Sequence, residues 1–288
     1  MEREIDSFIS YLHNIRKTSH NTEMSYRRDL TKLRIYLEIT AGSPEVHEVT
    51  KENLKRYIAY MERKKFKAST ISRSIASIRA FYHYLLKEGL VREDISECLK
   101  APKVKRKTPD ILSAEEMERL LDQPSGDSDK EIRDNAMLQL LYATGIRVSE
   151  LISLRLSGVN MHMGFLICRE GGRERMIPFG NEVREALQRY LAKVRDHMVT
   201  NEAKDILFVN CSGMPMSRQG FWKLVKSYAK KAGISTDITP HTLRHTFAAH
   251  MVESGTDLKS VQEMLGHSDI STTHMYVDLG KKKQEETE

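Results

Sequence analysis

The chain has 288 residues, enough for two domains, and its 40% hydrophobic and 30% charged residues argue against wholesale disorder. Three scattered cysteines without CxxC spacing disfavour a disulfide framework and a cysteine-rich zinc site. No apolar run approaches the roughly 18 residues of a membrane span, and the acidic, mixed start MEREIDSFIS is unlike a signal peptide. We therefore expect a cytoplasmic protein with no membrane partner.

The net charge of +6 is unevenly distributed along the chain. Residues 1–110 hold 23 Lys and Arg against 15 Asp and Glu, whereas residues 111–288 hold 23 against 25. For any single basic pair a solvated helix face is the simpler interpretation. The excess over the whole first part nevertheless favours a nucleic-acid partner, because Lys and Arg neutralise backbone phosphates.

Residues 1–100 are predicted to form a small all-helical domain. Apolar residues recur at helical spacing over 5–12 and 26–37, and Thr50 opens a third helix that runs to Met61.

A fourth helix is predicted from Ala68 to Glu88, with an apolar stripe from Ile71 to Leu85. Its other side is expected to carry small hydroxyls and arginines: Ser69, Ser72, Arg73, Ser74, Ser77 and Arg79. Such a face suits a helix laid against a DNA backbone, although an ordinary amphipathic helix explains this segment equally well.

Residues 101–110 (APKVKRKTPD) carry two prolines and four basic residues, which predicts an extended linker between domains. A basic linker can also follow a nucleic-acid backbone. The DNA contacts that we expect from the helix and the linker together are Arg73, Arg79, Lys103, Lys105, Arg106 and Lys107.

Residues 111–276 are predicted to form a second, mainly helical domain. A capping box at Ser113 opens its first helix, and Gly145 ends a longer helix that begins near Asp129. Further helices are predicted over 181–198, 217–232, 241–253 and 258–265, with a short last one from Ser271.

A small antiparallel sheet is expected within the second domain. Apolar runs at 165–168 and 176–179 flank the turn 170–172, which predicts a β-hairpin, and 206–209 is a candidate third strand. The predicted fold class is therefore mainly α: an N-terminal helical domain and a mostly helical second domain with a three-stranded antiparallel sheet.

His241 and Arg244 stand three residues apart, on one face of a predicted helix close to its N-terminus. Helix N-termini attract anions, and a guanidinium beside an imidazole suits a phosphate. Each residue taken singly is more often a surface or packing residue. We expect the packing role for His245 and His250, which fall on other faces.

Three further positions carry candidate chemistry. Arg147 stands between two predicted helices, where an ion pair with Glu150 is the alternative to a role in binding. Gly266 ends a helix and leaves His267 in a turn, and Tyr276 follows nine residues later. A lone tyrosine in that place would normally belong to the core.

These pieces together resemble the tyrosine recombinase (phage-integrase-like) family. The motifs are ATGIRVSEL around Arg147, HTLRH with His241 and Arg244, LGH ending at His267, and then Tyr276. The resemblance covers the whole chain, because residues 1–100 and the linker also resemble the family's SAM-like core-binding domain. The compact length is most similar to the Xer branch, which resolves chromosome dimers, and an archaeal Xer-type member is the expected closest relative.

The resemblance implies a site-specific recombinase that works on double-stranded DNA as a homotetramer on two sites, without metal or nucleotide cofactor. Tyr276 would attack the scissile phosphate, form a 3′-phosphotyrosyl bond and release a 5′-hydroxyl. Arg147 and Arg244 would clamp the non-bridging oxygens, His267 would donate to the same oxygens, and His241 would assist proton transfer.

The sequence departs from the family where a lysine is expected as general acid in the hairpin turn. Glu170 stands at that place, and no lysine lies within 169–175. Arg169 or Arg173 would substitute electrostatically while water or another group supplies the proton, because an arginine is a poor proton donor at neutral pH. An alignment shifted by a residue or two and a slow enzyme are the alternatives.

The family also implies that the charged tail 277–288 docks in trans on a neighbouring subunit, with a disordered tail as the alternative in the free protein. Two other functions compete with recombination. One is a type IB topoisomerase-like enzyme that nicks and reseals one strand, and the other is a non-catalytic DNA-binding protein on the same fold.

Overall fold

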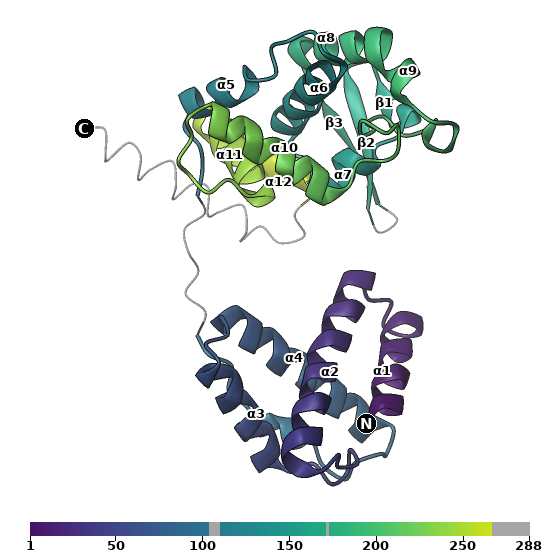
Figure 1. Cartoon of the computed structure of the whole chain (residues 1–288), viewed down its shortest axis with the longest axis vertical. Coiled ribbons are helices and arrows are strands. Elements are labelled where there is room, and N and C mark those ends of the chain that lie inside the picture. The colour runs from purple at the N-terminus through teal and green to yellow at the C-terminus, as the bar shows by residue number, and fades with distance from the viewer. Residues whose placement is uncertain (104–109, 171–172, 267–288) are drawn as a thin grey trace, which may run out of the picture. The chain divides into compact units, whose positions relative to one another are not determined.

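The computed structural model describes residues 1–103, 110–170 and 173–266 (Figure 1). The chain divides into two compact units, Met1–Lys107 and Thr108–Glu288. In the described parts no helix combines the length and the apolar character that a membrane span requires. The predicted linker residues Lys105, Arg106 and Lys107, the predicted helix from Ser271 and the tail 277–288 lie outside the described residues.

The first unit is a helical bundle, as predicted. Its elements are α1 (Glu2–Asn14), α2 (His20–Ala41), α3 (Lys51–Arg63), α4 (Ala68–Lys87) and the short 3-10 helix η1 (Ile95–Cys98). The capping box that opens α3 is formed, since Thr50 and Asn53 exchange side-chain and backbone hydrogen bonds. Apolar stripes of all four long helices meet in one core, in which Leu33 and Phe81 are fully buried.

The polar face predicted for α4 is narrower than expected. Ser74 and Ser77 are fully buried, and the Ser77 hydroxyl donates to the Ser74 carbonyl at 2.9 Å. The Ser77 hydroxyl fits against the core because it bonds to its own helix backbone. The exposed face of α4 is therefore carried by residues such as Ser69, Arg73 and Arg79.

The second unit is mainly helical. It begins with α5 (Ala114–Leu121), α6 (Asp129–Thr144), α7 (Val148–Ser153) and η2 (Leu156–Gly158). After the strands follow α8 (Asn181–Tyr190), a π-helical stretch η3 (Leu191–Arg195), α9 (Asp196–Met198) and η4 (Asn201–Ala203). The last described helices are α10 (Arg218–Lys231), α11 (Pro240–Glu253) and α12 (Leu258–Leu265).

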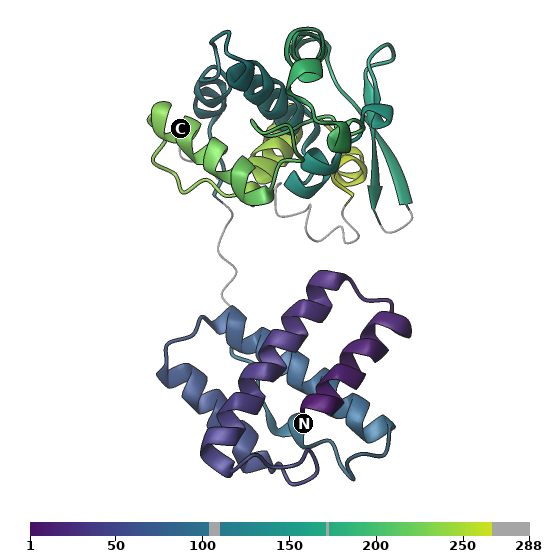
Figure 2. The same cartoon turned by 45° about the vertical axis from the view of Figure 1, so that its right-hand side comes forward.

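A three-stranded antiparallel sheet in the order β1-β2-β3 lies within this unit, and α12 packs beside β3 (Figure 2). Its strands are β1 (Val159–Asn160), β2 (Phe165–Glu170) and β3 (Arg173–Pro178). The predicted hairpin is confirmed, with Cys168 opposite Arg175. In this sheet Leu166 and Ile177 point into the core, where both are fully buried.

The predicted third strand at 206–209 is wrong. The third strand is β1, and residues 206–209 form only isolated bridges, from Ile206 to Arg155 and from Val209 to Pro215. The segment is apolar for another reason. Leu207 and Phe208 are fully buried and fill the core, so the apolar run reflects burial and not the alternation of a strand.

Candidate active site

Arg147 is held at the junction of two helices. α6 ends at Gly145, whose φ of +58° is the left-handed conformation that glycine adopts without strain, and Arg147 is the N-cap of α7. Glu150 accepts a hydrogen bond from the Arg147 backbone at 2.7 Å and lies 3.6 Å from its Nη1. The ion pair considered from the sequence is thus present, and it orients Arg147 while a third of its side chain stays exposed.

Arg244 projects from the first turns of α11. Thr239 caps this helix through a reciprocal pair of hydrogen bonds with Thr242, and Pro240 occupies the first turn, as the sequence indicates. The Arg244 side chain is 7% exposed, and its Nη1 donates to the Gly145 carbonyl at 2.7 Å.

Both arginines reach the carboxyl end of α12. Nη2 of Arg244 donates to the Leu265 carbonyl, and Nη2 of Arg147 donates to the Gly266 carbonyl at 3.3 Å. Gly266 closes the helix with φ of +65°. The fold therefore brings together two guanidinium groups, from helices far apart in the sequence, at the point where the chain continues toward residue 267.

His241 is exposed in the first turn of α11, and its ring centroid lies 6.2 Å from that of His245. Burial, His241 and Arg244 together lower the pKa of His245 to about 4, so this imidazole is neutral at pH 7. His250 has the expected packing role, because its ring nitrogens bond to the Tyr142 hydroxyl and to a backbone carbonyl.

The structure leaves several predicted site residues without described surroundings. His267 and Tyr276 lie outside the described residues, and nothing is described of the side chains of Glu170 and Arg173. Arg169 is exposed, and its Nε donates to Glu174 at 2.6 Å.

Sequence reasoning missed Arg175 in β3. Its Nη2 donates to Glu150 at 2.8 Å and its Nε donates to the Met264 carbonyl at 3.0 Å. The available signal was the alternation of the strand, which places Arg175 on the same inward face as the buried Ile177. Cys168 lies opposite Arg175 in the hairpin. Burial raises the pKa of its thiol to about 12, so this thiol stays protonated at pH 7.

Two of the predicted DNA contacts in the first unit, Arg73 and Arg79, already have protein partners. Arg73 forms a two-pronged ion pair with buried Asp29, at 2.8 and 2.9 Å, which ties α4 to α2. Arg79 donates to the Leu99 carbonyl at 2.6 Å. Lys103 is exposed.

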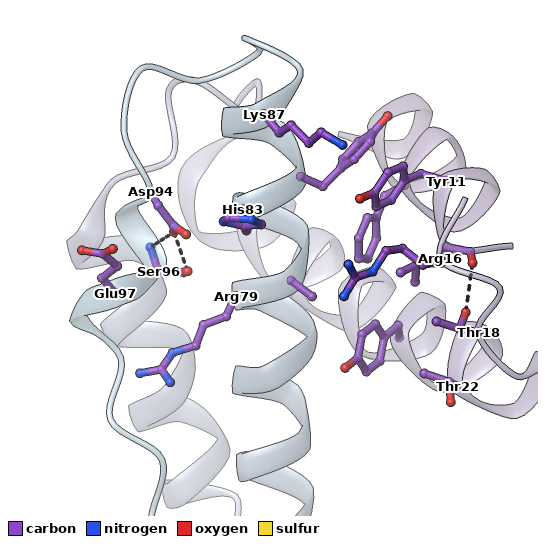
Figure 3. Close-up of a pocket in the computed structure, with 15 residues that line it drawn as sticks. Tyr11, Arg16, Thr18, Thr22, Arg79, His83, Lys87, Asp94, Ser96 and Glu97 are labelled. Carbon is purple, nitrogen blue, oxygen red and sulfur yellow. Dashed lines mark hydrogen bonds between the residues drawn. The ribbon is translucent and has the colours of Figure 1, made fainter. Parts of the chain in front are cut away.

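A groove of about 620 Å³ lies in the first unit between α1, α2, α4 and η1. Figure 3 shows Arg79, His83 and Lys87 along α4 and Arg16 on the connection between α1 and α2. The Lys87 ammonium lies 5.1 Å from the centre of the Tyr11 ring, within cation–π range. Of these residues, the sequence pattern singled out Arg79 alone.

Among the described residues, no three His, Cys, Asp or Glu side chains are grouped so that they could hold a metal ion. Two guanidinium groups at one helix end provide forked donors, and these match the oxygens of a phosphate.

Comparison with known proteins assigns the class. Residues 110–283 match the model of the phage integrase family, and residues 5–89 match that of the phage integrase N-terminal SAM-like domain. The chain belongs to the phage integrase family, the tyrosine recombinases, and it is a site-specific DNA recombinase.

Similar curated proteins are bacterial. The chain is 41% identical over 284 residues to tyrosine recombinase XerD of Halalkalibacterium halodurans, covering 98% of this chain and 95% of the relative. It is 42% identical over 285 residues to XerD of Oceanobacillus iheyensis, covering 98% and 96%. The expected special similarity to archaeal members is not supported, because these relatives come from bacteria.

Solved structures share the fold. A XerA recombinase is 26% identical with a TM-score of 0.56 and covers 98% of this chain and 96% of its own. A XerH site-specific recombinase bound to its palindromic difH substrate is 20% identical with a TM-score of 0.75, covering 94% and 80%.

Proposed function

We propose that this chain is a Xer-type recombinase that cuts and rejoins duplex DNA through a 3′-phosphotyrosyl bond at Tyr276. The observation that carries the proposal is the convergence of Arg147 and Arg244 on the carboxyl end of α12, directly before His267. In such a site an incoming phosphate competes with backbone carbonyls for guanidinium donors that are already positioned. Donors fixed in advance avoid the cost of reorganisation during the reaction.

The roles of the individual residues follow from the chemistry of the transfer. Tyr276 attacks phosphorus, its proton leaves with the help of His241, and the 5′-oxygen departs as a hydroxyl. Arg147 and Arg244 stabilise the negative charge that develops on the non-bridging oxygens, and His267 adds a third donor. Because the phosphotyrosyl bond replaces the phosphodiester bond, the second transfer reseals the strand without an external energy source.

The leaving 5′-oxygen needs a proton that no lysine of the hairpin can supply. We propose that Arg169 or Arg173 stabilises the charge on this oxygen while water delivers the proton, since a guanidinium does not release one near neutral pH. For this role Arg169 must break its ion pair with Glu174 and contact the substrate instead. Both groups of that pair are exposed, so the exchange is inexpensive.

We propose that double-stranded DNA is the partner and that four copies act on two sites in the cytoplasm, where they resolve chromosome dimers. The positive excess of residues 1–110 and exposed Lys103 support DNA binding by the first unit and the linker, where Lys105, Arg106 and Lys107 add charge. Arg73 is bonded to Asp29 and Arg79 to the Leu99 carbonyl, so each would contact DNA through its other guanidinium N–H groups. Among similar solved structures, a XerH site-specific recombinase is bound to its palindromic difH substrate, and a lambda integrase dimer is bound to a core site.

The test begins with DNA selected for binding from a random-sequence library and then nicked near the candidate cleavage point. Wild-type protein is expected to give a covalent protein–DNA band on a denaturing gel, and Tyr276→Phe is expected to give none. A duplex bound by the wild type without any adduct would establish a plain DNA-binding protein.

Strand exchange between two differently labelled duplexes then separates the two enzymatic alternatives. A recombinase joins one label to the other. Relaxation and resealing of a single duplex without exchange would establish the topoisomerase-like activity instead.

A further inference from the structure

Three successive backbone carbonyls end α12, and each accepts a hydrogen bond from a different arginine. The pairs are Arg175 with Met264, Arg244 with Leu265, and Arg147 with Gly266. Carbonyls in the last turn of a helix lack partners within the helix and carry its negative dipole end, so cations bind there favourably. Two of these arginines belong to the proposed catalytic set, and the third is unassigned.

We propose that Arg175 is a positioning residue, which acts on the reaction through its neighbours and does not touch the phosphate. This inference rests on the proposed recombinase function. Arg175 is 16% exposed, and its two described bonds go to Glu150 and to the Met264 carbonyl. It therefore joins β3 to the end of α12 and, at the same time, to the residue that orients Arg147.

The first effect of Arg175 is on the path of the chain after α12. A Cβ atom at Gly266 would lie 2.8 Å from Nη1 of Arg175 and 3.1 Å from its Cζ, so the guanidinium packs directly against this glycine. The contact with Arg175 therefore supports the left-handed backbone of Gly266, the residue directly before His267.

The second effect runs through Glu150. One carboxylate oxygen of Glu150 accepts from both the Arg175 side chain and the Arg147 backbone, at 2.8 and 2.7 Å. A chain of contacts therefore links the end of α12 to Arg147 through Arg175 and Glu150. Loss of Arg175 would remove one of the hydrogen bonds that hold this carboxylate, and a shift of the carboxylate would displace Arg147, the N-cap of α7.

The decisive variant is Arg175→Met, which keeps the length of the side chain and removes its donors. Single-turnover cleavage at saturating protein is expected to fall about 100-fold, because a displacement of about 1 Å costs this much in a positioned site. The Kd for the duplex is expected to change less than about threefold, since Arg175 makes no phosphate contact in this scheme. Arg175→Lys keeps the positive charge but loses the paired N–H donors of the guanidinium. Its cleavage rate should therefore lie between those of the wild type and Arg175→Met.

The control is Arg189→Met, which removes the same charge from the same unit. Arg189 lies on α8, pairs with Asp127 and is 38% exposed. Its cleavage rate is expected to match that of the wild type. Fluorescence of Trp222, the single tryptophan of the chain, reports whether each variant has a folded second unit.

A double-mutant cycle tests the route of the effect. If Arg175 acts through Glu150, the double variant with Glu150→Gln cleaves no more slowly than the slower single variant. Multiplied losses would refute transmission through Glu150.

The outcomes separate this inference from the proposed function. Absence of an adduct with wild-type protein refutes the function. A wild-type protein that forms the adduct, together with folded Arg175→Met that cleaves at the wild-type rate, refutes the positioning role alone. A loss in DNA affinity as large as the loss in rate also refutes it, because Arg175 then serves binding. Should Arg175→Met fail to fold, Arg175→Lys decides the question, and wild-type cleavage by that folded variant overturns the inference.

Discussion

Gly145 joins the end of α6 to the proposed active site, and Gly145→Ala is expected to damage both. Its φ of +58° is the left-handed conformation, and a Cβ atom there would lie 2.6 Å from Phe247 Cε1 and 2.9 Å from Leu265 Cδ2. The Gly145 carbonyl also accepts the hydrogen bond of Arg244 Nη1. A displaced carbonyl would therefore carry this arginine with it.

The magnitude is the sum of two costs. Alanine in the left-handed conformation costs about 1–2 kcal/mol. Overpacking of a tight core site against Phe247 and Leu265 adds about 1–3 kcal/mol. The free energy of unfolding of the second unit should therefore fall by about 2–5 kcal/mol. Gly233→Ala is the matched control, because Gly233 has φ of +68° in the same unit and open space around it.

Denaturant unfolding followed by Trp222 fluorescence measures the second unit selectively, since the first unit contains no tryptophan. The control isolates the backbone cost, and the difference between the two variants isolates the steric cost. Equal destabilisation by Gly145→Ala and Gly233→Ala would refute the close packing at Gly145.

Three other predictions follow from contacts of the second unit. Asp134→Ala removes the carboxylate that pairs with buried Arg133 at 2.6 Å. The free energy of unfolding, monitored by Trp222 fluorescence, should fall by about 3–5 kcal/mol. A decrease below about 1 kcal/mol would contradict a stabilising role of this buried pair. His245 has a lowered pKa in the folded state, so folding stability is full above about pH 6.5 and declines toward pH 4. His245→Asn should flatten that pH dependence in denaturant titrations, and an unchanged slope would assign the decline to other groups. Cleavage of a nicked substrate by Arg169→Ala and Arg173→Ala should be slower for at least one of them, whereas full rates for both would show that neither replaces the hairpin lysine.

Helices were predictable from the sequence wherever periodicity and caps coincide. The stripe of α4 and the capping box at Ser113 are local signals, and the structure contains both the helix and the box. Gly145 and Gly266 end their helices in the left-handed conformation that their position after an apolar helix predicts.

The errors come from interactions that are not local. Burial of Ser74 and Ser77 depends on how α4 packs in its bundle, and an apolar run at 206–209 is compatible with either a strand or a core segment. The ion pair of Arg73 with Asp29, a residue on another helix, is likewise a contact that no spacing rule reveals.

In the candidate site, too, local features were predictable from the sequence and non-local contacts were not. Arg147 and Arg244 were identifiable from motifs, because their neighbours define caps and helix starts that are visible in the sequence. The meeting of both with Arg175 at the end of α12 requires the tertiary fold, since β3, α7, α11 and α12 contribute to it.

The most direct test of the central claim is to locate the covalent bond. Wild-type protein trapped on a nicked duplex, digested with protease and nuclease and analysed by mass spectrometry, should give one peptide in which Tyr276 carries a nucleotide through its 3′-phosphate. A nucleotide on any other residue, or attachment through a 5′-phosphate, would contradict the assignment of Tyr276 as the nucleophile of this recombinase.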